Sequence, residues 1–158
     1  MQIYVDMDGV LADFDLHYET TFNVKLPRRA FREPPYTADE VDWKAIRKTA
    51  NFFRDIPPMA DFKELWSFVE VYNPIILTGV PASVTEAATN KREWVDKNLG
   101  RDVSMVACLS KEKATWCRPG DILIDDWEKY RDLWVGAGGR WITHTSAAES
   151  VRQLKEML

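Results

Sequence analysis

Five short apolar runs recur along the chain, and segments with a helical pattern separate each run from the next. The runs cover residues 3–5, 74–78, 103–108, 121–126 and 140–144. They are almost continuously apolar, which is typical of strands that helices cover on both faces of a sheet. Strands that alternate with helices favour right-handed crossovers and parallel pairing. The sequence therefore predicts a three-layer α/β/α fold built on a five-stranded parallel sheet.

Capping patterns indicate where several helices begin. Ser83–Glu86 (SVTE) has the form of a capping box, and the helix that follows is expected to run to Leu99, with Gly100 closing it. Ser146–Glu149 (SAAE) is a second box, which starts a C-terminal helix. Further helices are expected over residues 110–117 and 127–139, after the third and fourth strands.

The stretch from Phe14 to Tyr72 interrupts this alternation because it contains no strand-like run. Helices are expected over 14–23, 39–53 and 61–72, with a capping box at Thr37–Glu40 and proline pairs at Pro34–Pro35 and Pro57–Pro58. An insertion directly after the first strand would lie above the carboxyl edge of the sheet. We therefore expect a sheet domain formed by residues 1–13 and 73–158, and a helical cap formed by residues 14–72.

Polar residues stand at the carboxyl ends of the predicted strands, where parallel sheets bind their ligands. They are Asp6 and Asp8 after the first strand, Thr78 and Gly79 at the end of the second, Lys111 and Lys113 after the third, and Asp125 and Asp126 at the end of the fourth. Gly9 provides the backbone freedom for a sharp turn after the first strand. The predicted topology brings these residues to one edge of the sheet.

Four carboxylates at one edge raise one another's pKa unless a cation compensates them. Oxygen ligands suit Mg²⁺, which binds in proteins together with substrate phosphate, so the pattern points to phosphoryl chemistry. One carboxylate can attack phosphorus and form an aspartyl-phosphate, and a second, two residues later, can act as general acid and base. A threonine hydroxyl, a backbone amide and a lysine would hold the phosphoryl oxygens.

The segments DMDGV, ILTG, SKEKATW and ILIDD resemble, in order, the four motifs of the haloacid dehalogenase (HAD) superfamily. DMDGVLADFD, NFFRDIPPM, REWVDKNLG, PGDILIDD and AGGRWITH resemble the 5′(3′)-deoxyribonucleotidase family within it, over nearly the whole chain. This resemblance implies a Rossmann-like core with strand order 3-2-1-4-5, a helical cap after the first motif, and a Mg²⁺-dependent phosphatase of nucleoside monophosphates.

The resemblance also implies roles for individual residues. Asp6 would be the nucleophile and a metal ligand, and Asp8 the general acid and base, with its backbone carbonyl on the metal. The remaining roles are Thr78, Gly79 and Lys113 (or Lys111) on the phosphate, Asp126 on the metal, Asp125 on the metal directly or through water, and Phe14 against the nucleoside. Arg54 is the best arginine candidate for a substrate contact. The other cap aromatics, Tyr36, Trp43, Phe52 and Phe53, are expected to pack the cap onto the sheet domain.

Two positions depart from the family pattern. Trp127 stands where an arginine often follows the two aspartates, and Gly79 stands where a serine often follows the threonine. The second change removes one hydroxyl from the phosphate site. Neither change affects the proposed nucleophile or metal ligands, but both bear on the choice of substrate.

Composition limits the remaining possibilities. The net charge of −4 gives no sign of a general nucleic-acid or membrane surface, and no apolar run is long enough to span a bilayer. We expect a cytoplasmic enzyme with reduced cysteines and a small phosphorylated substrate, without a stable nucleic-acid complex; a homodimer is left open. Two alternatives also remain open: a HAD phosphatase of another small metabolite or a polynucleotide 3′-phosphate, and a phospho-acceptor or nucleotide-binding module without turnover.

Overall fold

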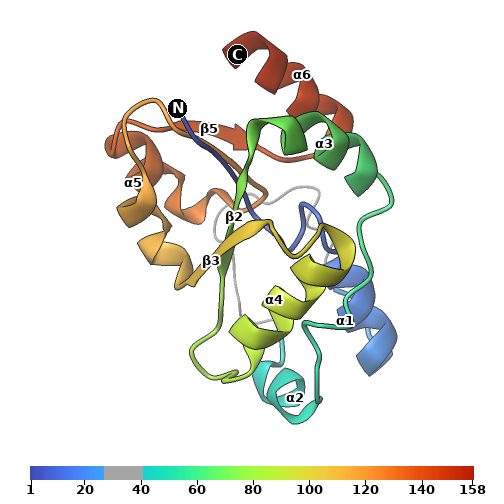
Figure 1. Cartoon of the computed structure of the whole chain (residues 1–158). Coiled ribbons are helices and arrows are strands. Elements are labelled where there is room, and N and C mark those ends of the chain that lie inside the picture. The colour runs from blue at the N-terminus through green and yellow to red at the C-terminus, as the bar shows by residue number, and fades with distance from the viewer. Residues whose placement is uncertain (27–40) are drawn as a thin grey trace.

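The computed structural model describes residues 1–26 and 41–158, and its centre is a five-stranded parallel sheet (Figure 1). The strands are Ile3–Val5 (β1), Ile75–Gly79 (β2), Ser104–Cys108 (β3), Ile122–Asp125 (β4) and Arg140–Thr143 (β5). Their order is β3-β2-β1-β4-β5, and every neighbouring pair is parallel. The predicted α/β fold and its 3-2-1-4-5 strand order are confirmed.

The helices form layers on the two faces of this sheet. They are α1 (Phe14–Phe22), α2 (Trp43–Lys48), α3 (Phe62–Val69), α4 (Ala87–Asn98), α5 (Arg131–Gly136) and α6 (Ala147–Met157), with shorter 3₁₀ helices η3 (Glu70–Tyr72), η4 (Ser110–Trp116) and η5 (Glu128–Tyr130). In Figure 1, α1, α3 and α4 lie on one side of the strands and α5 lies on the other. Each of these helices, within residues 1–26 and 41–158, is too short or too polar to cross a bilayer.

Alternate residues of the strands serve the two layers. Ile3 and Val5 of β1 are buried in the larger apolar cluster, which includes Trp94 of α4. Tyr4, between them, belongs to a second cluster that contains Trp134 of α5. A strand that is apolar at every position can therefore be buried on both faces, as the first apolar run predicted.

Of the two predicted boxes that lie in described residues, the one at Ser146 correctly places the start of a helix, and the one at Ser83 is wrong. The Ser146 hydroxyl accepts a hydrogen bond from the Glu149 amide at 3.2 Å, and α6 follows directly. Ser83 does not start α4, which begins only at Ala87 after two turns. The Glu86 carboxylate accepts instead from the amide of Asn51 in the insertion. This long-range contact uses the carboxylate that a capping box with Ser83 would need.

Two predicted helices are shorter than expected. The helix expected over 39–53 is reduced, among the described residues, to α2, which the Asp42 side chain caps. Asn51 has a φ of 58°, and this left-handed conformation is incompatible with continued helix. The helix expected over 127–139 is divided into η5 and α5. The capping box at 37–40 and Tyr36 lie outside the described residues.

The insertion after β1 leaves and rejoins the sheet domain at neighbouring points. The Asp13 amide donates to the Pro57 carbonyl at 2.8 Å, and the Met59 amide donates to the Leu11 carbonyl at 2.8 Å. The next helix, α3, packs against α6. The two ends of residues 14–56 are therefore joined by backbone hydrogen bonds.

Candidate active site

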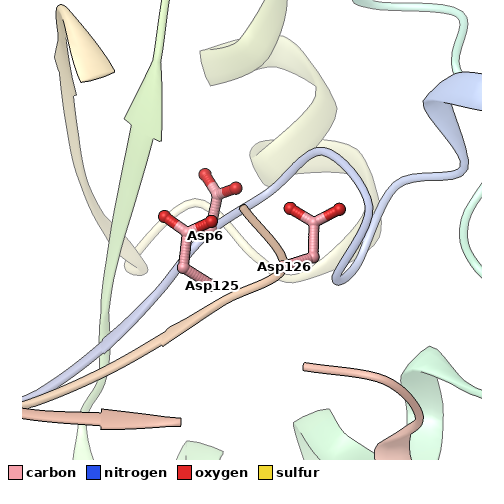
Figure 2. Close-up of side chains that lie close together, drawn as sticks. All are labelled: Asp6, Asp125 and Asp126. Atoms are coloured by element: carbon pink, nitrogen blue, oxygen red, sulfur yellow. The ribbon is translucent and has the colours of Figure 1, made fainter. Parts of the chain in front are cut away.

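Three carboxylates meet at the carboxyl edge of the sheet. Asp6 directly follows β1, Asp125 is the last residue of β4, and Asp126 follows it. Figure 2 shows the three side chains gathered close together. Each contributes an oxygen to a group whose atoms all lie within 4.8 Å of one another. Because β1 and β4 are paired in parallel, with Val5 opposite Ile124, the residues that follow both strands emerge side by side. This all-oxygen group suits a hard divalent cation.

Gly9 is required by the way the loop after β1 approaches Asp126. Its φ is +80°, and a Cβ at this position would lie 1.8 Å from Asp126 Oδ2. The loop is tightly turned, because the Met7 carbonyl accepts hydrogen bonds from the amides of Leu11 and Ala12, both at 2.9 Å. A side chain at position 9 would therefore displace the Asp126 carboxylate or open the turn.

Lys113 joins two members of the acidic cluster. Its Nζ lies 2.9 Å from Asp6 Oδ1 and 2.7 Å from Asp125 Oδ2, and all three side chains are buried. Asp125 is further held by the Trp127 amide, which donates to its Oδ1 at 2.9 Å. Although Trp127 replaces the arginine often found at this position, its backbone still contacts the cluster. Lys111, the alternative lysine, is exposed.

Burial and charge act in opposite directions on this group. Burial disfavours the ammonium form of Lys113, but the attraction of Asp125 and Asp6 outweighs it and raises the pKa of Lys113 above its ordinary value. Burial, followed by repulsion from Asp6, raises the pKa of Asp125, although Lys113 opposes this. Within the described residues, Lys113 supplies one ammonium group to this cluster, and carboxylates gathered in this way attract added cations.

Asp8 lies outside this carboxylate cluster and is bound by a second buried lysine. Lys91 Nζ lies 2.8 Å from Asp8 Oδ2, and the Lys91 side chain is only 1% exposed. The other oxygen, Asp8 Oδ1, is buried and has no hydrogen-bond partner among the residues that the structure describes. Lys91 thus holds one Asp8 oxygen in place, and the other is left without a hydrogen-bond partner among the described residues.

Lys91 also binds the end of β2. Its Nζ donates to Thr78 Oγ1 at 2.9 Å and to the Gly79 carbonyl at 2.6 Å. With Asp8, these contacts use all three N–H donors of the ammonium group. Because Thr78 Oγ1 accepts from Lys91, its own hydroxyl hydrogen remains available for another acceptor. The only other described partner is the Gly79 carbonyl, at a long 3.5 Å.

The sequence analysis missed Lys91, although a signal was present. Ala87, Lys91, Trp94 and Val95 share the buried face of α4 at helical spacing. A lysine at a core position of an amphipathic helix requires a buried partner. That pattern predicts an ion pair, but the identity of the acceptor, 83 residues away along the chain, follows only from the fold.

Aromatic residues of the insertion extend from this site. Phe14 is buried, and its ring lies 5.8 Å from Phe52 and 6.2 Å from both Phe53 and Trp43. Phe53 reaches the polar site, because Lys91 Nζ lies 4.9 Å from the centre of its ring. Phe52 and Phe53 are 1% exposed, as expected of residues that pack the insertion onto the sheet domain.

Arg54 does not join the cluster. It is exposed, and its Nε pairs with Asp55 Oδ1 at 2.9 Å. Pairing with Asp55 raises the pKa of Arg54, with smaller contributions from Glu93 and Glu86 of the α4 region. A substrate contact by Arg54 stays a prediction.

Comparison with known proteins agrees with this geometry. The family described as "5′ nucleotidase, deoxy (Pyrimidine), cytosolic type C protein" matches residues 1–147. A human protein named "5′(3′)-deoxyribonucleotidase, cytosolic type" is 28% identical over 150 residues, which cover 83% of this chain and 73% of the human protein. A Bordetella pertussis protein named "Putative 5′(3′)-deoxyribonucleotidase" is 28% identical over 145 residues, which cover 80% of this chain and 74% of its own length. The chain therefore belongs to the deoxy-type 5′-nucleotidase family of the HAD superfamily and is a phosphoric monoester hydrolase.

Proposed function

We propose that the protein is a Mg²⁺-dependent phosphomonoesterase that removes phosphate from a deoxynucleoside 5′- or 3′-monophosphate through an aspartyl-phosphate on Asp6. The observation that carries this proposal is the pair of buried lysine contacts at one sheet edge. Lys113 binds Asp6 and Asp125, and Lys91 binds Asp8 and Thr78. This arrangement holds two aspartates in different environments, as nucleophilic catalysis with separate acid–base assistance requires.

In the first step, a carboxylate oxygen of Asp6 attacks phosphorus and the ester bond from phosphorus to the sugar oxygen breaks. The contact from Lys113 holds the Asp6 carboxylate in position. The departing oxygen takes a proton from Asp8 and leaves as the nucleoside hydroxyl. Asp8 Oδ1 carries this proton, because Lys91 occupies Oδ2.

In the second step, Asp8 removes a proton from water and the water oxygen attacks phosphorus. The bond between phosphorus and Asp6 breaks, which releases inorganic phosphate and restores both carboxyl groups to their starting states. The Thr78 hydroxyl hydrogen, turned away from Lys91, donates to a phosphoryl oxygen in both steps.

The residues present fit a divalent cation. Asp6, Asp125 and Asp126 bring one carboxylate oxygen each within 4.8 Å of one another, and an all-oxygen donor set of this kind suits Mg²⁺. Asp6 and Asp126 would bind the ion, with Asp125 binding directly or through water and the Asp8 carbonyl completing the protein ligands. When bound, the ion supplies positive charge to the phosphoryl oxygens.

The choice of a nucleotide substrate rests on the aromatic cluster and on the relatives. Phe14 lies among rings that lead, through Phe53, to Lys91 at the polar site. An aromatic ring beside a phosphate site suits the base of a nucleotide, whose flat face stacks on such rings. The human and Bordetella relatives are both named as 5′(3′)-deoxyribonucleotidases.

Phosphate release from a panel of phosphate esters tests this proposal. The panel contains ribo- and deoxynucleoside 5′- and 3′-monophosphates, sugar phosphates and a 3′-phosphorylated oligonucleotide, each with Mg²⁺ and with EDTA. We expect Mg²⁺-dependent turnover that is fastest with a deoxynucleoside monophosphate. Faster turnover of a sugar phosphate or of the oligonucleotide would replace the nucleotide assignment, and equal rates in EDTA would exclude the metal.

A further inference from the structure

The side chain of Ser110 covers the α-carbon of Gly79 at the end of β2. A Cβ added to Gly79 would lie 2.2 Å from Ser110 Oγ, so the hydroxyl occupies the space that a side chain at position 79 would need. Gly79 pairs with Cys108 in the sheet, and Ser110 stands two residues beyond Cys108. The Ser110 hydroxyl therefore lies at the carboxyl edge, next to the proposed active site.

The side chains of Ser110 and Lys113 leave η4 on the same face. The two residues are three positions apart in the 3₁₀ helix η4, and side chains at that spacing in such a helix lie directly above one another. Lys113 extends to Asp6 and Asp125. The Ser110 side chain thus leaves η4 on the face that looks toward the acidic cluster.

The hydroxyls of Thr78 and Ser110 lie on opposite faces of the sheet. Consecutive residues of a strand direct their Cβ atoms to opposite sides. Thr78 Oγ1 meets Lys91 of α4 on one side, whereas the Cβ direction of Gly79 meets Ser110 of η4 on the other. A group bound at the end of β2 would have one hydroxyl on each side of it.

Ser110 Oγ is half-buried and makes no hydrogen bond within residues 1–26 and 41–158. We propose that this hydroxyl donates a hydrogen bond to the phosphoryl group of the substrate and so supplies, from η4, the hydroxyl that position 79 lacks. This inference rests on the proposed phosphatase function. Ser110 would then be a substrate-binding residue that lies outside β2 and far along the chain from Gly79.

Three variants separate the hydroxyl from the space that it fills. Ser110→Ala removes the hydroxyl and keeps Cβ. The double variant G79S/S110G moves the hydroxyl to position 79 and clears the space around it, and G79A/S110G makes the same backbone changes without a hydroxyl. Thr115→Ala is the matched control, because Thr115 is exposed on the same helix and its hydroxyl donates only to the Glu112 carbonyl.

The readouts are kcat/KM for the best substrate of the panel and the inhibition constant of inorganic phosphate. Loss of a hydrogen bond to a charged group weakens binding by a factor of roughly 10 to 100. We expect Ser110→Ala and G79A/S110G to lose that factor in kcat/KM and to bind phosphate more weakly. G79S/S110G should recover most of the loss, and Thr115→Ala should match the parent chain.

Equal kcat/KM and phosphate inhibition in Ser110→Ala and the parent chain would overturn the role of Ser110. So would equal losses in the two double variants, since that result assigns the effect to packing rather than to the hydroxyl. Thermal unfolding of each variant identifies any that fail to fold. A parent chain that releases no phosphate from any member of the panel would instead overturn the proposed function, so the two failures are distinguishable.

Discussion

Lys91 Nζ lies 2.8 Å from Asp8 Oδ2 and gives its two other N–H donors to Thr78 and Gly79. One buried ammonium group thus ties together the loop after β1, the end of β2 and helix α4. Of its three acceptors, Thr78 and Gly79 are proposed to bind the phosphate, and Asp8 is proposed to act as the general acid and base. We therefore expect Lys91 to affect catalysis by positioning Asp8 and by directing the Thr78 hydroxyl.

Lys91→Met tests this link, because methionine keeps most of the side-chain volume. We expect kcat to fall roughly a hundredfold or more, with a loss of about 2 to 3 kcal/mol in the free energy of unfolding, because Asp8 and Thr78 lose their buried partner. Urea unfolding and steady-state kinetics measure the two effects. Lys97→Met, at an exposed site on the same helix, is the control. Unchanged kcat in Lys91→Met would contradict the positioning role.

Asp6→Asn tests the nucleophile. Asparagine retains the shape of the side chain but cannot form an acyl phosphate, so phosphate release should fall roughly a thousandfold or more. Circular dichroism should show an intact fold. Asp13→Asn is the control in the same segment: Asp13 caps α1 by accepting from the Leu16 amide, and asparagine caps equally well. Parent-like turnover in Asp6→Asn would rule out the aspartyl-phosphate route.

Gly9→Ala tests the close approach to Asp126. Both the positive φ and the 1.8 Å approach to Asp126 Oδ2 oppose a side chain here, so we expect Mg²⁺ affinity to fall roughly tenfold or more. Gly120→Ala is the matched control, since Gly120 has a φ of +88° with no atom within 4 Å of its added Cβ. It should cost about 1 kcal/mol in stability and leave metal affinity unchanged. Isothermal titration calorimetry measures the affinities, and equal Mg²⁺ binding in both variants would contradict the prediction.

The stabilisation by Mg²⁺ should depend on pH. Burial, followed by repulsion from Asp6, raises the pKa of Asp125 from 3.8 to about 6. Since the folded value exceeds the unfolded one, this group favours the metal-free fold below the unfolded pKa and loses that contribution as pH rises through about 6. Protons and Mg²⁺ compete for the cluster, so the rise in Tm on adding Mg²⁺ should be larger at about pH 7.5 than at about pH 5.

Thermal unfolding at both pH values checks this expectation, with NaCl at matched ionic strength as the control. Asp125→Asn removes the titrating group and should reduce the difference between the two pH values. A Mg²⁺-induced shift that is the same at both pH values would show that the titration of Asp125 does not control metal binding.

Phe14→Leu tests nucleoside recognition. If the ring contacts the nucleoside, KM for a deoxynucleoside monophosphate should rise roughly tenfold, the order of one base-stacking contact. The kcat/KM for p-nitrophenyl phosphate, which carries no nucleoside, should change little. Phe22→Leu, farther along α1 against Phe52, controls for packing. Equal losses on both substrates would assign Phe14 a structural role only.

The sheet and the acidic cluster could be predicted from the sequence because both depend on short-range patterns. Apolar runs bounded by polar residues indicate strands, and parallel pairing brings the residue after each strand to the same edge. Asp6 and Asp126 follow two strands that lie side by side, so their convergence follows from topology alone.

Other features depend on contacts that no local pattern contains. The Glu86 carboxylate accepts from the Asn51 amide rather than forming a capping box with Ser83. The extended Thr49 ends α2, and the positive φ of Asn51 keeps the helix from resuming before Phe52. The fit of Ser110 against Gly79 arises from two elements that meet only in the folded chain. The sequence therefore predicted the positions of the strands but not the side-chain contacts between residues that are far apart along the chain.

The backbone hydrogen bonds from Asp13 to Pro57 and from Met59 to Leu11 make residues 14–56 a closed excursion from fixed anchor points. Once the ends of a loop are held together, a change in its length costs little free energy. The excursion can thus be lengthened, shortened or exchanged while Asp6, Asp8 and Asp126 keep their places. We therefore expect that replacement of this one segment can change substrate preference without changing the proposed hydrolytic residues.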